Sequence, residues 1–492
     1  MPTPGSPASE PPVPEPPASE PPVPDSPVPE PPAAASPVPD SPVPVFPPGF
    51  LWGAAASAFQ TEGAADTGGK GPSGWDEFAA RGRIKDGADA SRGTGFLDRY
   101  EEDADLLAGL GTDAFRFSIS WPRVVPGGSG PVNPEGLAFY DRLVDALLAR
   151  GITPAATLYH WDTPLPLERA GGWLERDTAA RFAEYTAQVA ARLADRVPLW
   201  ITINEPAEVT LLGYALGEHA PGRRLLFDAL PAAHHQLLAH GLAVQALRAA
   251  GAGGIGIALS HSPVRAAGPD EADRSAAALY DTLTNWMFAD PVLTGRYPDD
   301  GLAALLPGPV ADDLAVIGAP LDWYGVNYYH PMAVGAPTGD PAADGFAGIE
   351  LPGGLPFGLR ETESAERTDF GWPVVPEGLY EILTGLRARF GDRLPPVMVT
   401  ENGCSCDALD DRRRIAFLDG HLRALHRAIT DGVPVRGYFT WSLTDNIEWA
   451  EGASQRFGLV HVDYATLRRT PRASYAWYRE LIAAQRARVR EG

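Results

Sequence analysis

The stretch PPVMVTENG, residues 395–403, joins a short apolar run to an acidic residue. The run Val397-Met398-Val399 has the length and β-branched content of a buried parallel strand, and Gly403 ends it. Glu401 therefore lies at the carboxyl end of a predicted strand, which is where α/β folds place their reactive groups. One glutamate at a strand end is weak evidence by itself, because most such residues are solvated.

A second stretch follows the same pattern. The apolar residues 199–203 (LWITI) lead directly into Asn204, Glu205 and Pro206. Two predicted strands, far apart in the sequence, thus each end in an asparagine and a glutamate. This repetition predicts a site built on two carboxylates.

Strand-like and helix-like segments alternate from Phe46 to the end of the chain. Eight strands are predicted, at 50–59, 114–120, 153–160, 199–205, 254–260, 323–329, 397–402 and 435–442. Helical periodicity lies between them, at 98–110, 134–150, 176–196, 227–250, 377–390 and 412–430. Eight βα units predict an α/β fold of the (β/α)8 TIM-barrel type. An open doubly wound sheet is the alternative, but no glycine-rich dinucleotide motif follows the first strand. The long segment 330–376 is predicted to be a loop that walls the mouth of the site.

The N-terminal segment has a different composition. Residues 1–45 are rich in proline and contain six acidic and no basic residues, which predicts an extended, disordered tail before a single catalytic domain at 46–492. Such a tail serves as a spacer, as a docking peptide or as a solvated leader.

Whole-chain composition limits the class of ligand. The net charge of −23 argues against nucleic acid and against an anionic membrane surface as partners. No apolar stretch is long enough to span a bilayer, and no signal peptide is recognisable, so a cytoplasmic protein is expected. The only two cysteines, Cys404 and Cys406, do not form a metal-site pattern, and we expect neither a metal nor a cofactor.

The predicted strand ends share a chemistry. They contribute two carboxylates, amides, a histidine and several flat aromatic rings: Gln60, Arg116, His160, Trp161, Asn204, Glu205, Asn327, Tyr329, Glu401 and Trp441, with Glu448 and Trp449 in the loop after the last strand. Sugars suit this combination, because each hydroxyl donates and accepts hydrogen bonds while the C–H face of the ring stacks on indole. A small carbohydrate is therefore the expected ligand.

Ordered motifs along residues 46–485 resemble glycoside hydrolase family 1, the family of retaining β-glucosidases. The motifs are FLWGAAASAFQTEG (50–63), RFSISWPR (116–123), LYHWDTP (158–164), TINEP (202–206), GVNYY (325–329), TENG (400–403), and WSLTDNIEWAEG with RFGLVHVDY (441–464). The resemblance implies a β-glucosidase that releases terminal β-D-glucosyl residues from cellobiose, short oligosaccharides or aryl glucosides, with roles in carbohydrate metabolism and cellulose degradation.

The resemblance also implies residue roles. Glu401 would be the nucleophile and Glu205 the acid/base, with Arg116 and Tyr329 holding Glu401 ionised. The sugar would be bound by Gln60, His160, Trp161, Asn204, Asn327, Tyr329, Trp372, Trp441, Glu448, Trp449 and Phe457. The residue after Asn-Glu-Pro is Ala207, where family members often have an aromatic residue. This departure leaves the leaving-group preference open.

Three alternative functions remain. A 6-phospho-β-glycosidase is disfavoured by Glu448, whose charge would repel a phosphate. A catalytically inactive sugar-binding scaffold usually lacks one of the two glutamates, and both are present here. A transglycosylase differs from a hydrolase only in the acceptor, which the sequence does not reveal. The oligomeric state is likewise not predicted.

Overall fold

The computed structural model describes residue 1, residues 42–89 and residues 91–491. The predicted tail, residues 1–45, therefore lies almost entirely outside the described residues. In the part that is described, Val43 and Phe46 are buried. The Phe46 backbone N–H donates to Oε1 of Gln485 at 2.9 Å, so this segment is fixed to the C-terminal helix. The packed chain thus includes residues just before the predicted boundary at 46.

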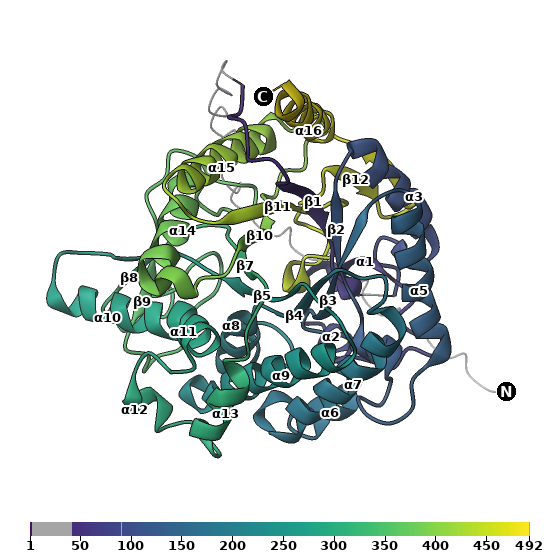
Figure 1. Cartoon of the computed structure of the whole chain (residues 1–492). Coiled ribbons are helices and arrows are strands. Elements are labelled where there is room, and N and C mark those ends of the chain that lie inside the picture. The colour runs from purple at the N-terminus through teal and green to yellow at the C-terminus, as the bar shows by residue number, and fades with distance from the viewer. Residues whose placement is uncertain (2–41, 90, 492) are drawn as a thin grey trace. The chain divides into compact units, whose positions relative to one another are not determined.

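Eight parallel strands form a closed barrel, which confirms the predicted fold (Figure 1). They are β1 (Leu51–Ala55), β2 (Ala114–Ser118), β3 (Thr153–Tyr159), β4 (Leu199–Asn204), β5 (Ile255–Ser260), β7 (Tyr324–Asn327), β10 (Val397–Asn402) and β11 (Val435–Trp441). Pairing of β1 with both β2 and β11 closes the barrel. The open doubly wound alternative is wrong. The first strand ends at Ala55 and not at the predicted residue 59, because Ala58–Thr61 forms a short helix, α1.

Helices surround the barrel (Figure 1). Those predicted from periodicity are α3 (Phe96–Leu110), α5 (Pro134–Ala149), α7 (Asp177–Leu193), α9 (Leu230–Ala249), α14 (Pro376–Phe390) and α15 (Arg412–Thr430). Proline at the first turn of α5 and left-handed Gly111 after α3 explain two of their boundaries. The C-terminal helix α16 (Ala473–Glu491) was not predicted, although Tyr478 and Ile482 place buried side chains one turn apart.

Three insertions enlarge the end of the barrel where the strands finish. After β4 come helix α8 (Pro206–Glu208) and the π-helix η3 (Val209–Leu216). After β5 come β6 (Val264–Ala266), α10 (Glu271–Asp281) and a second π-helix, η5 (Thr282–Trp286). After β7, the segment predicted to be a loop contains β8 (Met332–Gly335) and β9 (Gly358–Arg360). In a small sheet, β8 pairs with β6 on one side and with β9 on the other. The segment predicted to be a loop at the mouth of the site therefore contains two short strands that were not predicted, while Phe346 and Trp372 from it do line the cavity.

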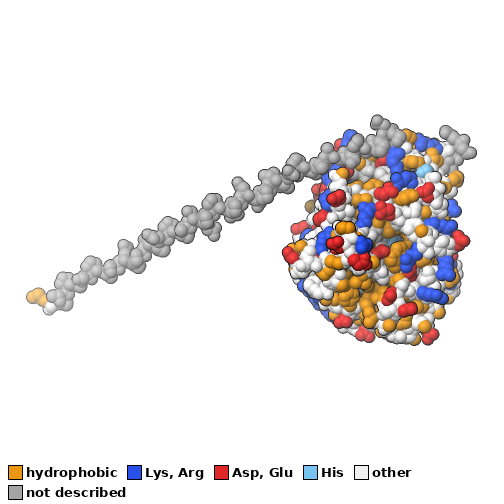
Figure 2. Space-filling model, turned by 90° about the vertical axis from the view of Figure 1, so that its left-hand side faces the viewer, with side chains coloured by type: hydrophobic (Ala, Val, Ile, Leu, Met, Phe, Trp, Pro, Cys, Tyr) orange, Lys and Arg blue, Asp and Glu red, His pale blue; other side chains and the backbone are white. Residues whose placement is uncertain are grey.

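Acidic and basic side chains are interspersed over the face shown in Figure 2. Ion pairs of the barrel domain include the contacts of Arg196 with Asp141 and Asp145. Among the described residues, no helix has the length and apolar character needed to cross a bilayer.

Candidate active site

A cavity of about 490 Å³ opens at the carboxyl ends of the strands and contains most of the predicted site. Its lining includes both glutamates and seven of the other predicted residues: His160, Trp161, Tyr329, Trp372, Trp441, Glu448 and Trp449. The other predicted residues contact this lining: Gln60, Arg116, Asn204, Asn327 and Phe457. The volume is within the range of about 300–1,000 Å³ that is typical of small-molecule sites.

Glu401, near the carboxyl end of strand β10, is held by a cation and a phenol. Arg116 Nη1 donates to its Oε1 at 2.5 Å, and Tyr329 Oη donates to its Oε2 at 2.8 Å. The guanidinium and the carboxylate are both buried, with side chains 1% and 4% exposed. A buried guanidinium stabilises the ionised form of a carboxyl group that it contacts. The surroundings of Glu401 therefore suit a carboxylate.

Glu205, which follows β4 directly, has no such cation contact and is bound by amides. Asn327 Nδ2 donates to its Oε1 at 2.8 Å, and Asn204 Nδ2 to its Oε2 at 3.3 Å. Burial, followed by the negative charge of Glu401, holds the pKa of Glu205 well above its ordinary value. These surroundings therefore favour the protonated form of Glu205.

Asn204 connects the two glutamates. Its Oδ1 accepts from Arg116 Nη2 at 2.6 Å and from Asn327 Nδ2 at 3.0 Å. Its Nδ2 donates to Nε2 of His160 at 3.2 Å. Burial, followed by the charge of Arg116, holds the pKa of His160 well below its ordinary value, so the ring is neutral. The network fixes the orientation of the amide on which both carboxyl groups depend.

Gln60 and Glu448 come together from the two ends of the domain. Gln60 Nε2 lies 3.3 Å from Glu448 Oε2 and donates to Asn446 Oδ1 at 2.9 Å, while Ser57 Oγ donates to Gln60 Oε1 at 2.6 Å. Burial raises the pKa of Glu448 to about 8, with a further contribution from Glu401.

Aromatic rings form the remaining walls. Trp161 and Trp449 pack with ring centroids 4.4 Å apart, and Trp441 lies face to face with His160. On another side, Trp372 lies 5.5 Å from Tyr329 and 6.0 Å from Phe457. Such rings offer flat apolar surfaces beside the hydrogen-bonding groups.

Three site residues adopt left-handed backbone conformations, which are unfavourable for side chains with a Cβ. Their φ angles are +78° for Trp161, +47° for Glu205 and +49° for Trp449. Conformations of this kind persist where the surrounding structure imposes them, and they concentrate at functional sites. Here they orient three side chains toward the cavity: Trp161 after β3, Glu205 after β4 and Trp449 after Glu448.

Some cavity residues were missed by sequence reasoning. Glu208 lies one helical turn after Glu205, and its spacing of three was a usable signal. Asn446 and Ser57 are also part of the Gln60 network, but nothing in their local sequence sets them apart. Within the described residues, no group of three or more histidine, cysteine or acidic side chains is arranged to hold a metal ion.

The sequence of this chain is similar to those of known enzymes. The family model described as "Glycosyl hydrolase family 1" matches residues 43–487. Thermostable beta-glucosidase B of Thermobispora bispora is 45% identical over 451 residues, covering 89% of this chain and 90% of the relative. A bifunctional beta-D-glucosidase/beta-D-fucosidase of Bifidobacterium breve is 42% identical, covering 90% and 99%.

Solved structures with the same fold include enzymes bound to sugar-like inhibitors. The psychrophilic beta-glucosidase of Micrococcus antarcticus has a TM-score of 0.84 and 46% identity, covering 90% of this chain and 98% of that one. The Thermotoga maritima beta-glucosidase in complex with glucoimidazole has a TM-score of 0.82 and 38% identity, covering 90% and 99%.

Proposed function

The chain belongs to glycosyl hydrolase family 1 and is a retaining β-glucosidase, and we propose that Glu401 is its nucleophile and Glu205 its acid/base. The observation that carries this assignment is the contrast between the two carboxyl groups. Glu401 contacts a guanidinium, whereas Glu205 contacts amides and has a raised pKa. Two carboxyl groups in different surroundings can perform opposite roles at one pH.

In the first step, a Glu401 oxygen attacks the anomeric carbon while Glu205 transfers its proton to the glycosidic oxygen. The C–O bond to the leaving group breaks, and a glycosyl ester of Glu401 forms. Tyr329 and Arg116 hold the attacking carboxylate in place. The leaving group departs as a neutral alcohol.

In the second step, water attacks the anomeric carbon and Glu205 accepts its proton, while the bond between that carbon and the Glu401 oxygen breaks and releases Glu401 as a carboxylate. Because Glu401 is now an ester, its negative charge no longer opposes ionisation of Glu205, and the pKa of Glu205 falls. The same residue therefore acts first as an acid and then as a base. Two inversions give net retention of configuration.

The glycone is proposed to bind at the polar end of the cavity. Gln60 and Glu448 would share hydroxyls at C4 and C6, His160 would bind the neighbouring hydroxyl, and Asn204 the 2-hydroxyl. Trp441 would lie beneath the sugar, with Trp161, Trp449, Asn327, Trp372 and Phe457 completing the site. The fucosidase activity in the name of the B. breve relative supports a site that accepts more than one glycone.

The alternatives have less support. Both glutamates lie in intact hydrogen-bond networks, which does not favour an inactive scaffold. Glu448 occupies the position where a 6-phosphate would have to bind, and Glu451 adds a second acid nearby. Whether water or a sugar is the preferred acceptor decides between hydrolysis and transglycosylation.

Trapping the intermediate tests the proposed roles. A 2-deoxy-2-fluoro-β-D-glucosyl fluoride should inactivate the enzyme and leave one glycosyl group on the peptide that contains Glu401, as read by mass spectrometry. Proton NMR of an aryl β-glucoside digest should show β-glucose as the first product. Label on another residue, or α-glucose as the first product, would contradict the mechanism.

A further inference from the structure

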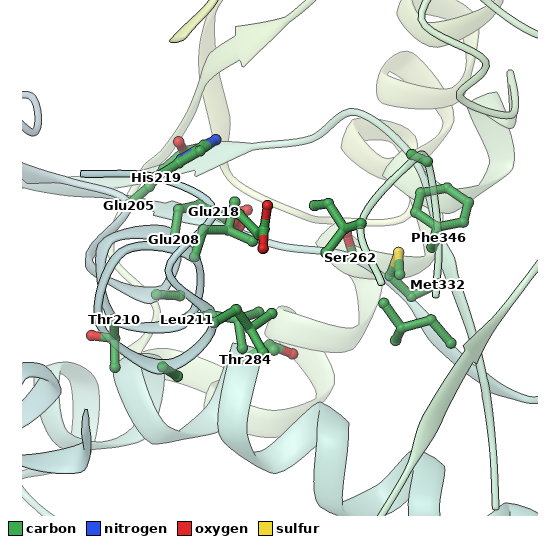
Figure 3. A pocket seen from close by; sticks show the side chains of 18 of the residues that line it. Glu205, Glu208, Thr210, Leu211, Glu218, His219, Ser262, Thr284, Met332 and Phe346 are labelled. Carbon is green, nitrogen blue, oxygen red and sulfur yellow. The ribbon is translucent and has the colours of Figure 1, made fainter. Parts of the chain in front are cut away.

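The cavity continues past Glu205 into a part that the glycone does not use. Its walls are mainly apolar, and we call this part the apolar lobe, defined by Leu211, Leu212, Tyr280, Met332, Phe346 and Leu359. These side chains come from all three insertions at the barrel end. Figure 3 shows Glu205 at one side of this space, with Met332 and Phe346 across from it. The leaving group of a bound glucoside would extend in this direction, because Glu205 protonates the oxygen that joins it to the sugar.

The polar groups in the walls of the apolar lobe are few, and they include the Tyr280 hydroxyl and the His330 ring, which packs on Phe346. The Ser262 hydroxyl donates to the carbonyl oxygen of His330 at 2.8 Å. The Thr284 hydroxyl donates to the carbonyl oxygen of Tyr280, also at 2.8 Å. A second sugar ring has several hydroxyls, and against these walls most of them would lose water without gaining a partner. The lobe therefore disfavours a second sugar as the leaving group.

Glu208 adds a carboxyl group to these walls. It lies in α8, one turn after Glu205, and its side chain extends into the cavity toward Ser262 (Figure 3). A hydrogen bond from Ser260 reaches its carboxyl group, and burial raises its pKa. A carboxyl group has lone pairs for more than one donor, so Glu208 can accept a further hydrogen bond from a ligand.

Ala207 adds room beside the acid/base. It also lines the cavity, between Glu205 and Glu208, and its side chain is a single methyl group. The space near the scissile oxygen is therefore open toward the lobe, and a ring could pass this position to reach the lobe.

We propose that the leaving-group site takes an apolar aglycone, aromatic or isoprenoid, that carries a hydroxyl group, and that Glu208 accepts a hydrogen bond from that hydroxyl. The inference rests on the proposed function, because it takes the direction of the leaving group from the role of Glu205. It narrows the substrate class to glucosides of hydroxylated apolar alcohols, in preference to cellobiose.

A matched pair of substrates tests the proposal. 2-Phenylethyl β-D-glucoside and 2-(4-hydroxyphenyl)ethyl β-D-glucoside differ by one remote hydroxyl, so their leaving-group acidities are the same. With wild-type enzyme, kcat/KM for the phenylethyl glucoside should exceed that for cellobiose by about tenfold or more. The hydroxyl should add about threefold to tenfold, the gain expected for one hydrogen bond.

Variants locate the hydrogen bond. In Glu208→Leu the gain from the hydroxyl should disappear, and in Glu208→Gln it should be partly kept. The control is Glu218→Leu, which removes a carboxylate that lines the same cavity and lies 3.7 Å from Arg224. This control should keep the full gain. The ratio between two substrates is the readout, because it cancels any change in the proton affinity of Glu205 that the Glu208 variants cause.

The outcomes separate this inference from the function on which it rests. If 4-nitrophenyl β-glucoside is not hydrolysed at all, the proposed function fails. If it is hydrolysed but cellobiose equals the phenylethyl glucoside, the apolar lobe does not select the leaving group. If the hydroxyl gain survives in Glu208→Leu, Glu208 is not the acceptor.

Discussion

At the scale of the residue, the site depends on two glutamates that have the same chemistry and different neighbours. Glu401 has Arg116 and Tyr329, and Glu205 has Asn204 and Asn327. The sequence motifs predict the two roles, but they do not reveal that Asn204 touches both networks. That contact depends on the geometry of the closed barrel, in which β2, β4 and β7 aim at one point.

The pKa of Glu205 should depend on the charge of Glu401. In free enzyme, burial and this charge raise the pKa of Glu205, so kcat/KM should fall on the alkaline side as Glu205 loses its proton. In the 2-fluoroglucosyl enzyme, Glu401 is neutral and the pKa of Glu205 should be lower. Carbon-13 NMR titration of labelled glutamate in both forms measures the difference. An unchanged pKa would mean that burial alone sets it.

Glu448 should distinguish glucosides from fucosides. Its contact with Gln60 places it where it can also reach the 6-hydroxyl, which a fucoside lacks. Glu448→Ala should therefore lower kcat/KM for a glucoside about tenfold to a hundredfold, as expected when a buried hydroxyl loses its hydrogen-bond partner. The loss for the matched fucoside should be smaller. Equal losses on both substrates would rule out the 6-hydroxyl contact.

At the scale of the element, prediction from sequence succeeded where periodicity is strong. All eight barrel strands and six helices were placed because buried strands and amphipathic helices repeat with characteristic periods. Strands β8 and β9 were missed, because segments of four and three residues in a region rich in glycine and proline carry no period. These missed strands belong to the insertion that carries Phe346 and the wall of the apolar lobe.

The segment before β1 offers a test of element packing. Phe46 is 2% exposed and packs on Phe50 and Trp52, with ring centroids 4.6 and 5.0 Å away. Phe46→Ala should destabilise the protein by about 3–5 kcal/mol, the usual cost of truncating a buried phenylalanine.

Removing residues 2–41, whose composition predicts no core, should leave the melting temperature nearly unchanged. Chemical denaturation and calorimetry of both variants provide the comparison, and a large loss of stability on truncation would contradict the prediction that residues 2–41 contribute no core.

At the scale of the whole molecule, the barrel is what makes distant residues into one site. Arg116 and Glu401 are separated by most of the domain, yet they form a buried ion pair because β2 and β10 end at the same rim. The motifs predict that these residues belong together, and eight βα units predict the rim. Selection of the leaving group could not be predicted in the same way. It depends on how the three insertions after β4, β5 and β7 pack together, and no sequence motif within them predicts that packing.

Azide rescue is the most direct test of the assigned roles. In Glu401→Gly, azide should restore turnover of an activated β-glucoside by attacking the anomeric carbon in place of the missing nucleophile, which gives α-glucosyl azide. In Glu205→Gly, azide should instead attack the glycosyl ester of Glu401 and give β-glucosyl azide. NMR of the products reads both results in one experiment. The opposite pairing of variant and anomer would show that the nucleophile and the acid/base are exchanged, and would contradict the account.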